Sequence, residues 1–260
     1  DWFLKPVSSA AGINARRIDL TSIDSHLPKG RILQQFVSGR TLSGLYLVSA
    51  NGVQLLGMTE QLCGTPEAGA SGVLYSGSLA PLSIRDVPPT CFECADKIGS
   101  VIGSTIGRSL RGLIGIDFIR DEQSGELWTL EVNPRIPASA ELFARSYDWP
   151  LIQWHIAVCM GDDSIDWLPV TQWKQVTPPP DIWGKLILYA TEAVTVNSLQ
   201  EAVIELFDGE CTVADVPADG SRIESGMPIC TLLLKAASVD DCRQGLCQRS
   251  LTLRKWLHNQ

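Results

Sequence analysis

Short apolar stretches separated by turn residues follow one another along most of the chain and predict a protein rich in β-strands. We expect strands at residues 2–6 and 13–20, and a third in RILQQFVSG, which begins at Arg31 and ends in a loop at Ser38-Gly39. Two longer apolar runs turn at Asn51-Gly52, a dipeptide that β-hairpins favour. Residues 64–78 are rich in glycine, alanine and serine, so we expect a mobile loop there and consider it a candidate lid.

Other stretches repeat their apolar residues every three or four positions, as a helix with one buried face does. One has apolar residues at positions 91, 95, 98, 102, 106 and 110, and another, WPLIQWHIAVCMG, ends at Gly161. A further helix from about Val239 to Leu257 closes the chain. The proline-rich segment 176–183 is interpreted as an internal boundary, followed by short strands and this last helix.

Composition narrows the class of protein. The 260 residues are 45% hydrophobic, enough for one large domain or for one domain with a small companion. A net charge of −8 argues against general binding to nucleic acid or to an anionic membrane. No apolar run reaches the ~18 residues that a membrane span needs. We therefore expect neither nucleic acid nor a membrane as a partner.

The eight cysteines are scattered through apolar segments, which favours reduced thiols and a cytoplasmic location. Cys91 and Cys94 form a lone CxxC at the start of a predicted helix. Because the chain has only three histidines and no second CxxC, ordinary helix-start cysteines are favoured over structural zinc.

The segment GIDFIRDEQSGELWTLEVNPR, residues 115–135, predicts a hairpin with one acid on each strand. If the turn centres on Ser124, Asp117 lies opposite Glu131, with Cβ atoms ~5 Å apart. Such a pair repels unless a cation separates the charges or one acid is protonated. Asn133 projects from the same face as Glu131, so the three side chains offer the oxygen ligands that Mg²⁺ or Mn²⁺ prefers. The alternative is an ordinary polar face with both acids in solvent.

Two N-terminal segments are weak evidence for a function by themselves and are interpreted together with this hairpin. LKPVSSAAG places Lys5 at a strand end before a loop of small residues, which can cover phosphate groups with its backbone N–H groups. A solvated strand-end lysine is the alternative. LQQFVSG, residues 33–39, is interpreted as a short connection between two lobes, whose backbone groups could pair with an adenine edge between the apolar walls of Phe36 and Val37. An ordinary strand is the alternative there.

In this order, LKPVSSAAG, LQQFVSG and GIDFIRDEQSGELWTLEVNPR resemble the ATP-grasp superfamily over about residues 1–160. The resemblance implies an α+β fold in which two α+β lobes grip ATP, with a small β-rich extension at the C-terminus. Residues 1–37 would then form the C-terminal part of the small lobe, with the phosphate loop and hinge. Residues 38–175 would form the large lobe with the metal hairpin, and residues 181–260 the β-rich domain with its closing helix.

The resemblance also implies roles for individual residues. The residues that would bind the phosphates of ATP are Lys5, Ser8, Ser9 and Gly12. The hinge residues that would line the adenine site are Gln34, in place of a common acid, Gln35, Phe36 and Val37. The metal ligands to one or two Mg²⁺ or Mn²⁺ ions would be Asp117, Glu131 and Asn133. The catalytic residue would be Arg135, facing the transferred phosphoryl group or the acyl-phosphate intermediate.

The sequence departs from the family pattern in three respects. Many family members have a ribose-binding glutamate just after the hinge glycine, where this chain has Arg40-Thr41. Its phosphate loop is rich in serine and alanine instead of glycine. The family also has a preceding domain with an earlier nucleotide-binding lysine, and we therefore expect a truncated enzyme or half of a split one. Its protein partner would be the missing domain or a second copy of the chain.

The activity implied is that of an ATP-dependent carboxylate–amine ligase acting on a small acid and a small amine through an acyl phosphate. EVNPRIPASAELF, WGKLILYA and VADVPADGSRIESGMPICT look like ATP-grasp proteins associated with tetrahydromethanopterin and methanofuran biosynthesis, among them a tyramine–glutamate ligase. A non-catalytic or truncated nucleotide-binding module is the alternative function. A structural β-rich domain without a site is a further one.

Overall fold

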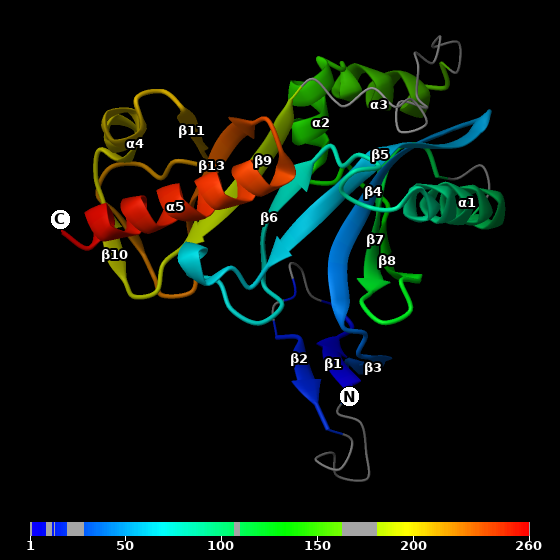
Figure 1. Ribbon diagram of the computed structural model, residues 1–260, viewed down its shortest axis with the longest axis horizontal. Helices are drawn as coiled ribbons and strands as arrows, with labels where there is room; N and C mark the ends of the chain where they lie inside the picture. Colours follow the sequence, from blue (N-terminus) through cyan, green and yellow to red (C-terminus); the bar gives the residue numbers. More distant parts are fainter. Residues whose placement is uncertain are drawn as a thin grey trace.

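The computed structural model describes residues 2–8, 12, 14–19, 29–106, 110–162 and 181–259 (Figure 1). Its main element is a sheet of eight strands in which all neighbouring strands are antiparallel. In spatial order these strands are β11 (Cys211–Ala214), β13 (Pro228–Ala236), β9 (Ile182–Tyr189), β6 (Tyr75–Ala80), β5 (Gly52–Cys63), β4 (Gly39–Ser49), β7 (Gly112–Asp121) and β8 (Leu127–Asn133).

The N-terminal strands form a separate small sheet, which lies at the end of the large sheet where β4 begins (Figure 1). Its order is β2–β1–β3, with β1 (Trp2–Pro6) in the centre between β2 (Arg16–Ile18) and β3 (Arg31–Gln35). These strands confirm the three N-terminal strands expected from the sequence, although β2 is shorter than 13–20. A third sheet pairs only β10 (Val194–Val196) with β12 (Ser221–Ile223).

Helices cover both faces of the large sheet. They are α1 (Pro89–Ile106), α2 (Ala140–Tyr147), α3 (Leu151–Cys159), α4 (Leu199–Phe207) and α5 (Val239–Leu257), with a 3-10 turn, η2 (Pro66–Ala68). The helices expected near 91–110, before Gly161 and at 239–257 are thus confirmed, the first ending at Ile106. Within the described ranges no helix combines the length and apolar character that a membrane span requires.

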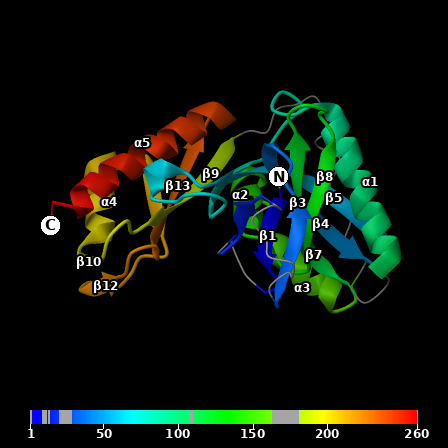
Figure 2. The same cartoon turned by 90° about the horizontal axis from the view of Figure 1, so that it is seen from below.

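Alternation along β4 divides the core into two layers, because successive side chains of a strand point to opposite faces. Leu42 and Tyr46 pack in one cluster with Phe92 of α1. Leu45 and Leu47 pack in the other, with residues of α2 and α3. Figure 2 shows α1 and α5 at opposite ends of the large sheet, and both helices contribute to the first cluster.

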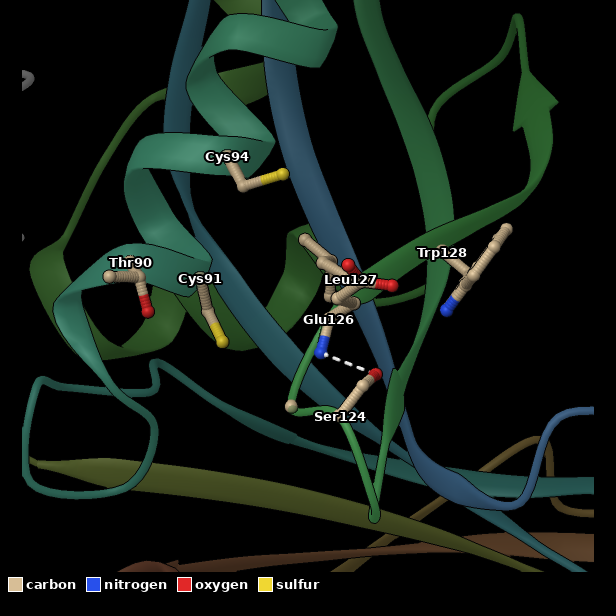
Figure 3. Close-up of a pocket in the computed structure, with 8 residues that line it drawn as sticks. Thr90, Cys91, Cys94, Ser124, Glu126, Leu127 and Trp128 are labelled. Carbon is tan, nitrogen blue, oxygen red and sulfur yellow. Dashed lines mark hydrogen bonds between the residues drawn. The ribbon is translucent and has the colours of Figure 1, made fainter.

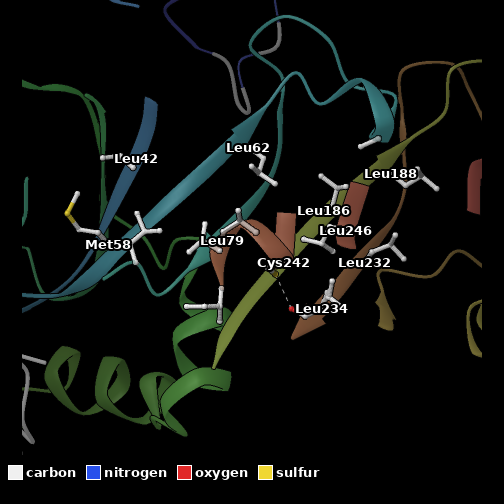
Figure 4. Close-up of a cluster of buried hydrophobic side chains, with 14 of the residues drawn as sticks. Leu42, Met58, Leu62, Leu79, Leu186, Leu188, Leu232, Leu234, Cys242 and Leu246 are labelled. Atoms are coloured by element: carbon white, nitrogen blue, oxygen red, sulfur yellow. Dashed lines mark hydrogen bonds between the residues drawn. The ribbon is translucent and has the colours of Figure 1, made fainter. Parts of the chain in front are cut away.

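Helix α5 lies very close to β9. A Cβ atom on Gly184 would collide with Cys242 and Leu246 of the helix, so only glycine fits at this crossing. Figure 4 shows Leu79 of β6 and Leu186 of β9 beside Cys242 and Leu246 of the helix, and all four belong to one hydrophobic cluster. Close packing of this kind makes the C-terminal helix part of the main core.

The hydrogen bonding of the sheet continues across the expected boundary at 176–183. Strand β9 pairs with β6, with Gly77 opposite Leu186 and Ala80 opposite Trp183. Both strands also contribute to the same hydrophobic cluster. The division into 1–37, 38–175 and 181–260 stays a prediction, and its last two parts share one sheet.

The prediction of a mobile loop and lid at 64–78 is wrong for residues 75–78. Those residues belong to β6, which is mostly buried in the middle of the sheet. The small side chains serve close packing, because a Cβ atom on Gly77 would collide with the backbone of Lys185. Ala68 and Ala70 are buried as well. The small residues that suggested a loop are therefore required, in β6, by the lack of space between neighbouring strands.

An ion-pair cluster joins α5 to the sheet. Glu60 Oε2 on β5 accepts hydrogen bonds from Arg40 Nε on β4, at 2.9 Å, and from Arg243 Nη2 on α5, at 2.7 Å. The Glu60 side chain is only 11% exposed, so its charge depends on these two partners. Arg40 Nη1 also donates to the Asp86 carbonyl at 2.6 Å. The Glu60 carboxylate thus links β4, β5 and α5, and Arg40 extends the connection to the loop that contains Asp86.

Replacing Glu60 with glutamine should lower the free energy of unfolding by about 2–4 kcal/mol, because Arg40 would lose its carboxylate partner and Arg243 would keep only the exposed Asp240. Urea denaturation at pH 7 measures the change. The matched control is Glu205→Gln on the exposed side of α4, which should change stability by less than about 0.5 kcal/mol. Equal effects of the two substitutions would contradict a structural role for the cluster.

Candidate functional site

The β7–β8 hairpin has the register that the sequence predicts around its acids. Asp117 lies opposite Glu131, and Gly115 lies opposite Asn133. Immediately beyond the pair the register shifts by one residue, so Phe118 faces Thr129. Irregularities of this kind are common beside functional sites, where they redirect side chains. The acid pair therefore occupies the last regular position before the shift.

The side chains of the hairpin converge. Asn133 Nδ2 donates to Asp117 Oδ2 at 2.9 Å and to Glu131 Oε1 at 3.1 Å. Gln61 Nε2, from β5, donates to the second oxygen of Asp117 at 2.9 Å. Glu131 is exposed, whereas Asp117 is half-buried. The alternative of an ordinary face with both acids in solvent is therefore wrong for Asp117.

The surroundings of Asp117 favour the protonated form of its side chain. Burial, and then the charge of Glu131, raise its pKa from 3.8 to about 6, against the opposing effects of hydrogen bonds from Ser43 and Asn133. The residue faces Ser43 on β4, whose side chain is buried. A positive charge placed nearby would therefore stabilise the ionised form of Asp117.

Arg135 completes the cluster. Its backbone N–H donates to the Asn133 carbonyl at 2.8 Å, which makes a tight turn around Pro134. Its guanidinium Nη2 lies 3.4 Å from Asn133 Oδ1 and is exposed. The structure therefore brings four of the predicted site residues together. Among the described residues, no group of three histidine, cysteine or acidic side chains is arranged to hold a metal, so a cation here would depend on the two acids, Asn133 and its own bound ligands.

The predicted phosphate residues lie on and after β1. Lys5 is half-buried and pairs with Ile32 of β3, and Ser8 is exposed. Gly12 has a φ of +76°, and a Cβ atom there would collide with the Val73 carbonyl, so the end of this loop lies against the segment before β6. Ser9 lies outside the described residues. A role for these residues in phosphate binding stays a prediction.

The hinge residues end β3 and lead into β4. Gln34 pairs with Phe3 and Gln35 with Trp2. The Phe36 ring lies 5.5 Å from the Phe3 ring and 4.2 Å from the Arg17 guanidinium, which anchors the end of the small sheet. Val37, which follows Phe36, is half-buried. Contact with adenine stays a prediction for all four residues.

The hinge contacts the turn of the acid hairpin. Glu122 N–H donates to the Ser38 carbonyl at 3.1 Å, and Ser38 Oγ donates to Glu122 Oε2 at 3.3 Å. A Cβ atom on Gly39 would collide with the Arg120 carbonyl. The small sheet therefore meets the hairpin through Ser38 and Gly39. Arg40 stands at the position of the family's ribose-binding glutamate. Its side chain donates hydrogen bonds to the Glu60 carboxylate and to the Asp86 carbonyl.

Sequence reasoning missed two residues that support the site. Gln61 contacts Asp117, and it lies opposite Ser78, which in turn lies opposite Lys185 of β9. Lys185 is buried and its Nζ donates to the Ala138 carbonyl in the loop after Arg135. Burial lowers the pKa of Lys185, and the nearby Glu141 opposes this shift. Only the register across three strands aligns these polar residues on one face.

The chain belongs to the ATP-grasp family: residues 1–139, more than half of it, match the sequence model described as an ATP-grasp domain. No curated protein matches the sequence significantly. The ATP-grasp fold expected from the sequence is thereby confirmed, with mixed helices and strands and a large antiparallel sheet.

Solved structures with the same fold include an L-amino acid ligase from Bacillus licheniformis, with a TM-score of 0.69 and 17% identity, covering 96% of this chain and 61% of that chain. The biotin carboxylase domain of 2-oxoglutarate carboxylase from Hydrogenobacter thermophilus, in complex with MgADP and bicarbonate, has a TM-score of 0.65 and 14% identity, covering 94% and 55%. N5-carboxyaminoimidazole synthetase from Staphylococcus aureus, complexed with ADP, has a TM-score of 0.54 and 12% identity, covering 83% and 51%. This chain spans about three fifths of the length of these relatives or less.

The raised pKa of Asp117 predicts a pH-dependent stability in metal-free buffer with a chelator. Because the folded protein binds this proton more tightly than the unfolded chain, the stabilisation is complete below about pH 4 and is lost as the pH rises through about 6. Asp117→Asn imitates the protonated acid. Its free energy of unfolding relative to wild type should therefore rise by up to about 3 kcal/mol between pH 4 and pH 7, measured by urea denaturation. The control Asp208→Asn, at the exposed end of α4, should show little such change, and a pH-independent difference for Asp117→Asn would contradict the prediction.

Proposed function

We propose that this chain carries the nucleotide and metal centre of an ATP-dependent ligase that joins a carboxylic acid to an amine through an acyl phosphate. The observation that carries the proposal is the contact of Asp117 and Glu131 through Asn133, with Arg135 beside them, in a chain of the ATP-grasp family. A half-buried acid beside a second acid is costly to the fold. A site for a cation and its phosphates explains why the pair is there.

In the proposed reaction an oxygen of the acid substrate attacks the γ-phosphorus of ATP, and the bond from that phosphorus to the β–γ bridging oxygen breaks, so ADP leaves. The amine nitrogen then attacks the acyl carbon, phosphate leaves with the electrons of the C–O bond, and the nitrogen loses a proton. Phosphoryl transfer asks a protein mainly for positioning and charge neutralisation. The charged residues of the cluster are of the types that supply both.

The donor set fits Mg²⁺ or Mn²⁺, because two carboxylates and an amide oxygen are hard ligands. Bound there, the cation would neutralise charge on the triphosphate. Asp117 and Glu131 are the ligands we propose first, since their oxygens already face one another through Asn133 Nδ2. Asn133 would act as a ligand through its amide oxygen. Arg135, whose guanidinium is exposed, would bind oxygens of the transferred phosphoryl group.

For the nucleotide we propose the residues that the family resemblance indicates. Lys5 with Ser8, Ser9 and Gly12 would bind phosphate oxygens, and the adenine would lie against the hinge residues Gln34, Gln35, Phe36 and Val37. The contact of Ser38 with Glu122 supports this arrangement, because it places the hinge next to the turn of the acid hairpin. The L-amino acid ligase among the structural relatives is named for ligation of amino acids, which favours a small acid and a small amine as substrates here. The narrower assignment to tetrahydromethanopterin or methanofuran biosynthesis rests on the sequence resemblance alone.

Glu131→Gln should abolish the stabilisation of the protein by Mg²⁺-ATP and reduce ADP release by at least about 100-fold, because the cation loses a charged ligand. The melting temperature with and without Mg²⁺-ATP measures binding. ADP release against a panel of acids, with hydroxylamine as the trapping amine, measures turnover. Glu126→Gln, an exposed residue at the turn of the same hairpin, is the matched control and should behave as wild type.

These measurements also decide between the two candidate functions. Wild-type protein that is stabilised by Mg²⁺-ATP but releases no ADP with any acid and amine would indicate a nucleotide-binding module. Near-normal turnover of Glu131→Gln would remove the metal assignment.

Arg135→Ala should separate binding from chemistry. Its charge is expected to act on the phosphoryl group in transfer, so turnover should fall at least about 100-fold while the stabilisation by Mg²⁺-ATP stays within a few degrees of wild type. Arg85→Ala, an exposed arginine before α1, is the control. If Arg135→Ala lowered binding and turnover in parallel, Arg135 would be a nucleotide-binding residue and not a catalytic one.

A further inference from the structure

A pocket of about 440 Å³ lies between the first turn of α1 and the turn of the β7–β8 hairpin (Figure 3). The helix contributes both cysteines of the CxxC motif, Cys91 and Cys94, and the hairpin contributes Ser124, Leu127 and Trp128 among others. In Figure 3 both sulfur atoms point toward the hairpin side of the pocket. Neither the acid cluster nor the hinge uses this pocket. The paired thiols that line it are therefore unexplained by the proposed ligase activity.

The spacing of the two cysteines suits a disulfide. Residues three apart in an α-helix have Cα atoms about 5 Å apart, within the range of about 4.4–6.8 Å that disulfides adopt. Cys91 lies in the first turn of α1, where its N–H donates to the Pro88 carbonyl at 2.9 Å, and Cys94 lies three residues further along the same helix. All eight cysteines have free thiols, these two included.

The two thiols differ in access. Cys91 is 2% exposed, and Cys94 is partly exposed at the pocket. Burial raises the pKa of Cys91, and the guanidinium groups of Arg120 and Arg40 oppose that shift. Arg120 Nε is buried and finds no acceptor among the described residues. An arginine beside a buried thiol stabilises the thiolate at the moment it forms.

We propose that Cys91 and Cys94 form a reversible disulfide by exchange with a small-molecule disulfide that enters this pocket. The Cys94 thiolate attacks one sulfur of the incoming disulfide, whose S–S bond breaks, and the departing thiolate takes a proton from water. Cys91, after losing its proton, attacks Cys94 Sγ and releases the second thiol. The two cysteines are thereby oxidised by two electrons, and the small disulfide is reduced to two thiols.

The other buried cysteines provide an internal contrast. Burial raises the pKa of Cys211 to about 11 and that of Cys230 and Cys242 to about 12. They lie in the core between the C-terminal strands and α5, where close packing leaves an oxidant no entry. Cys63 and Cys159 are exposed but stand apart from each other on β5 and α3. Cys247 is partly exposed on α5, and the nearest cysteine of that helix, Cys242, is buried and five residues away. Only the α1 pair joins a partly exposed thiol to a second thiol three residues away in the same helix.

The test uses the full chain treated with glutathione disulfide, followed by alkylation of the remaining thiols and mass analysis of tryptic peptides. Residues 86–97 form one tryptic peptide that contains Cys91 and Cys94 and no other cysteine. We expect this peptide to lose two alkylation sites together, with the loss of two hydrogens, and to regain them with dithiothreitol. A pair that stays alkylatable while glutathione adds to Cys63 or Cys159 would overturn the proposal.

Single variants test the order of attack. Cys91→Ser should accumulate a glutathione adduct on Cys94, because the resolving thiol is gone, whereas Cys94→Ser should form no adduct at Cys91. Because Cys91 belongs to the core cluster, Cys91→Ala serves as a second variant if the serine substitution prevents folding. Cys159→Ser is the control and should leave the 86–97 disulfide unchanged. Equal adduct formation in both pocket variants would also overturn the proposal, and none of these readouts depends on ligase activity.

Discussion

The constraint on which the site depends is the repulsion between two carboxylates on neighbouring strands. Asp117 is half-buried by the sheet and faces Glu131 directly, so the folded protein holds it at a pKa well above the ordinary value. Hydrogen bonds from Asn133 and Gln61 satisfy its oxygens but do not neutralise the charge. An arrangement that costs stability in this way is expected at functional sites, because a positive ligand converts the cost into binding free energy.

The rest of the fold supports that pair from both sides. The hairpin that carries it is paired with β4 along ten residues, and β4 begins at the hinge. On the opposite side of β4, the sheet continues through β5 and β6 into β9 and β13, which α5 covers. Glu60 joins β4, β5 and α5 through its two arginines. The C-terminal segment therefore contributes to the rigidity of the site although it supplies none of the four converging residues.

Sequence reasoning succeeded where local chemistry is decisive. The turn residues after Asp121 set the pairing of Asp117 with Glu131, and the alternation along the strand placed Asn133 on the same side. It failed where the same composition serves two purposes. Gly77 and the serines on either side of it are typical of a loop, but here Gly77 allows β6 to pack closely against β9. Gln61 and Lys185 carry no local signal, because their relation to the acids exists only through pairing between distant strands.

The amino-acid sequence by itself determined the acid hairpin and the amphipathic helices, because both depend on short-range patterns of turn chemistry and side-chain period. Its motifs also indicated the ATP-grasp family, to which the match over residues 1–139 assigns the chain. Only the tertiary structure decided that Arg40 is held by Glu60, that the CxxC thiols line a pocket against the hairpin turn, and that one sheet runs through the expected domain boundary. Those features join residues separated by 20 to more than 100 positions. Contacts over such separations follow from how the strands are ordered and how the helices pack on them, and no local pattern encodes that order.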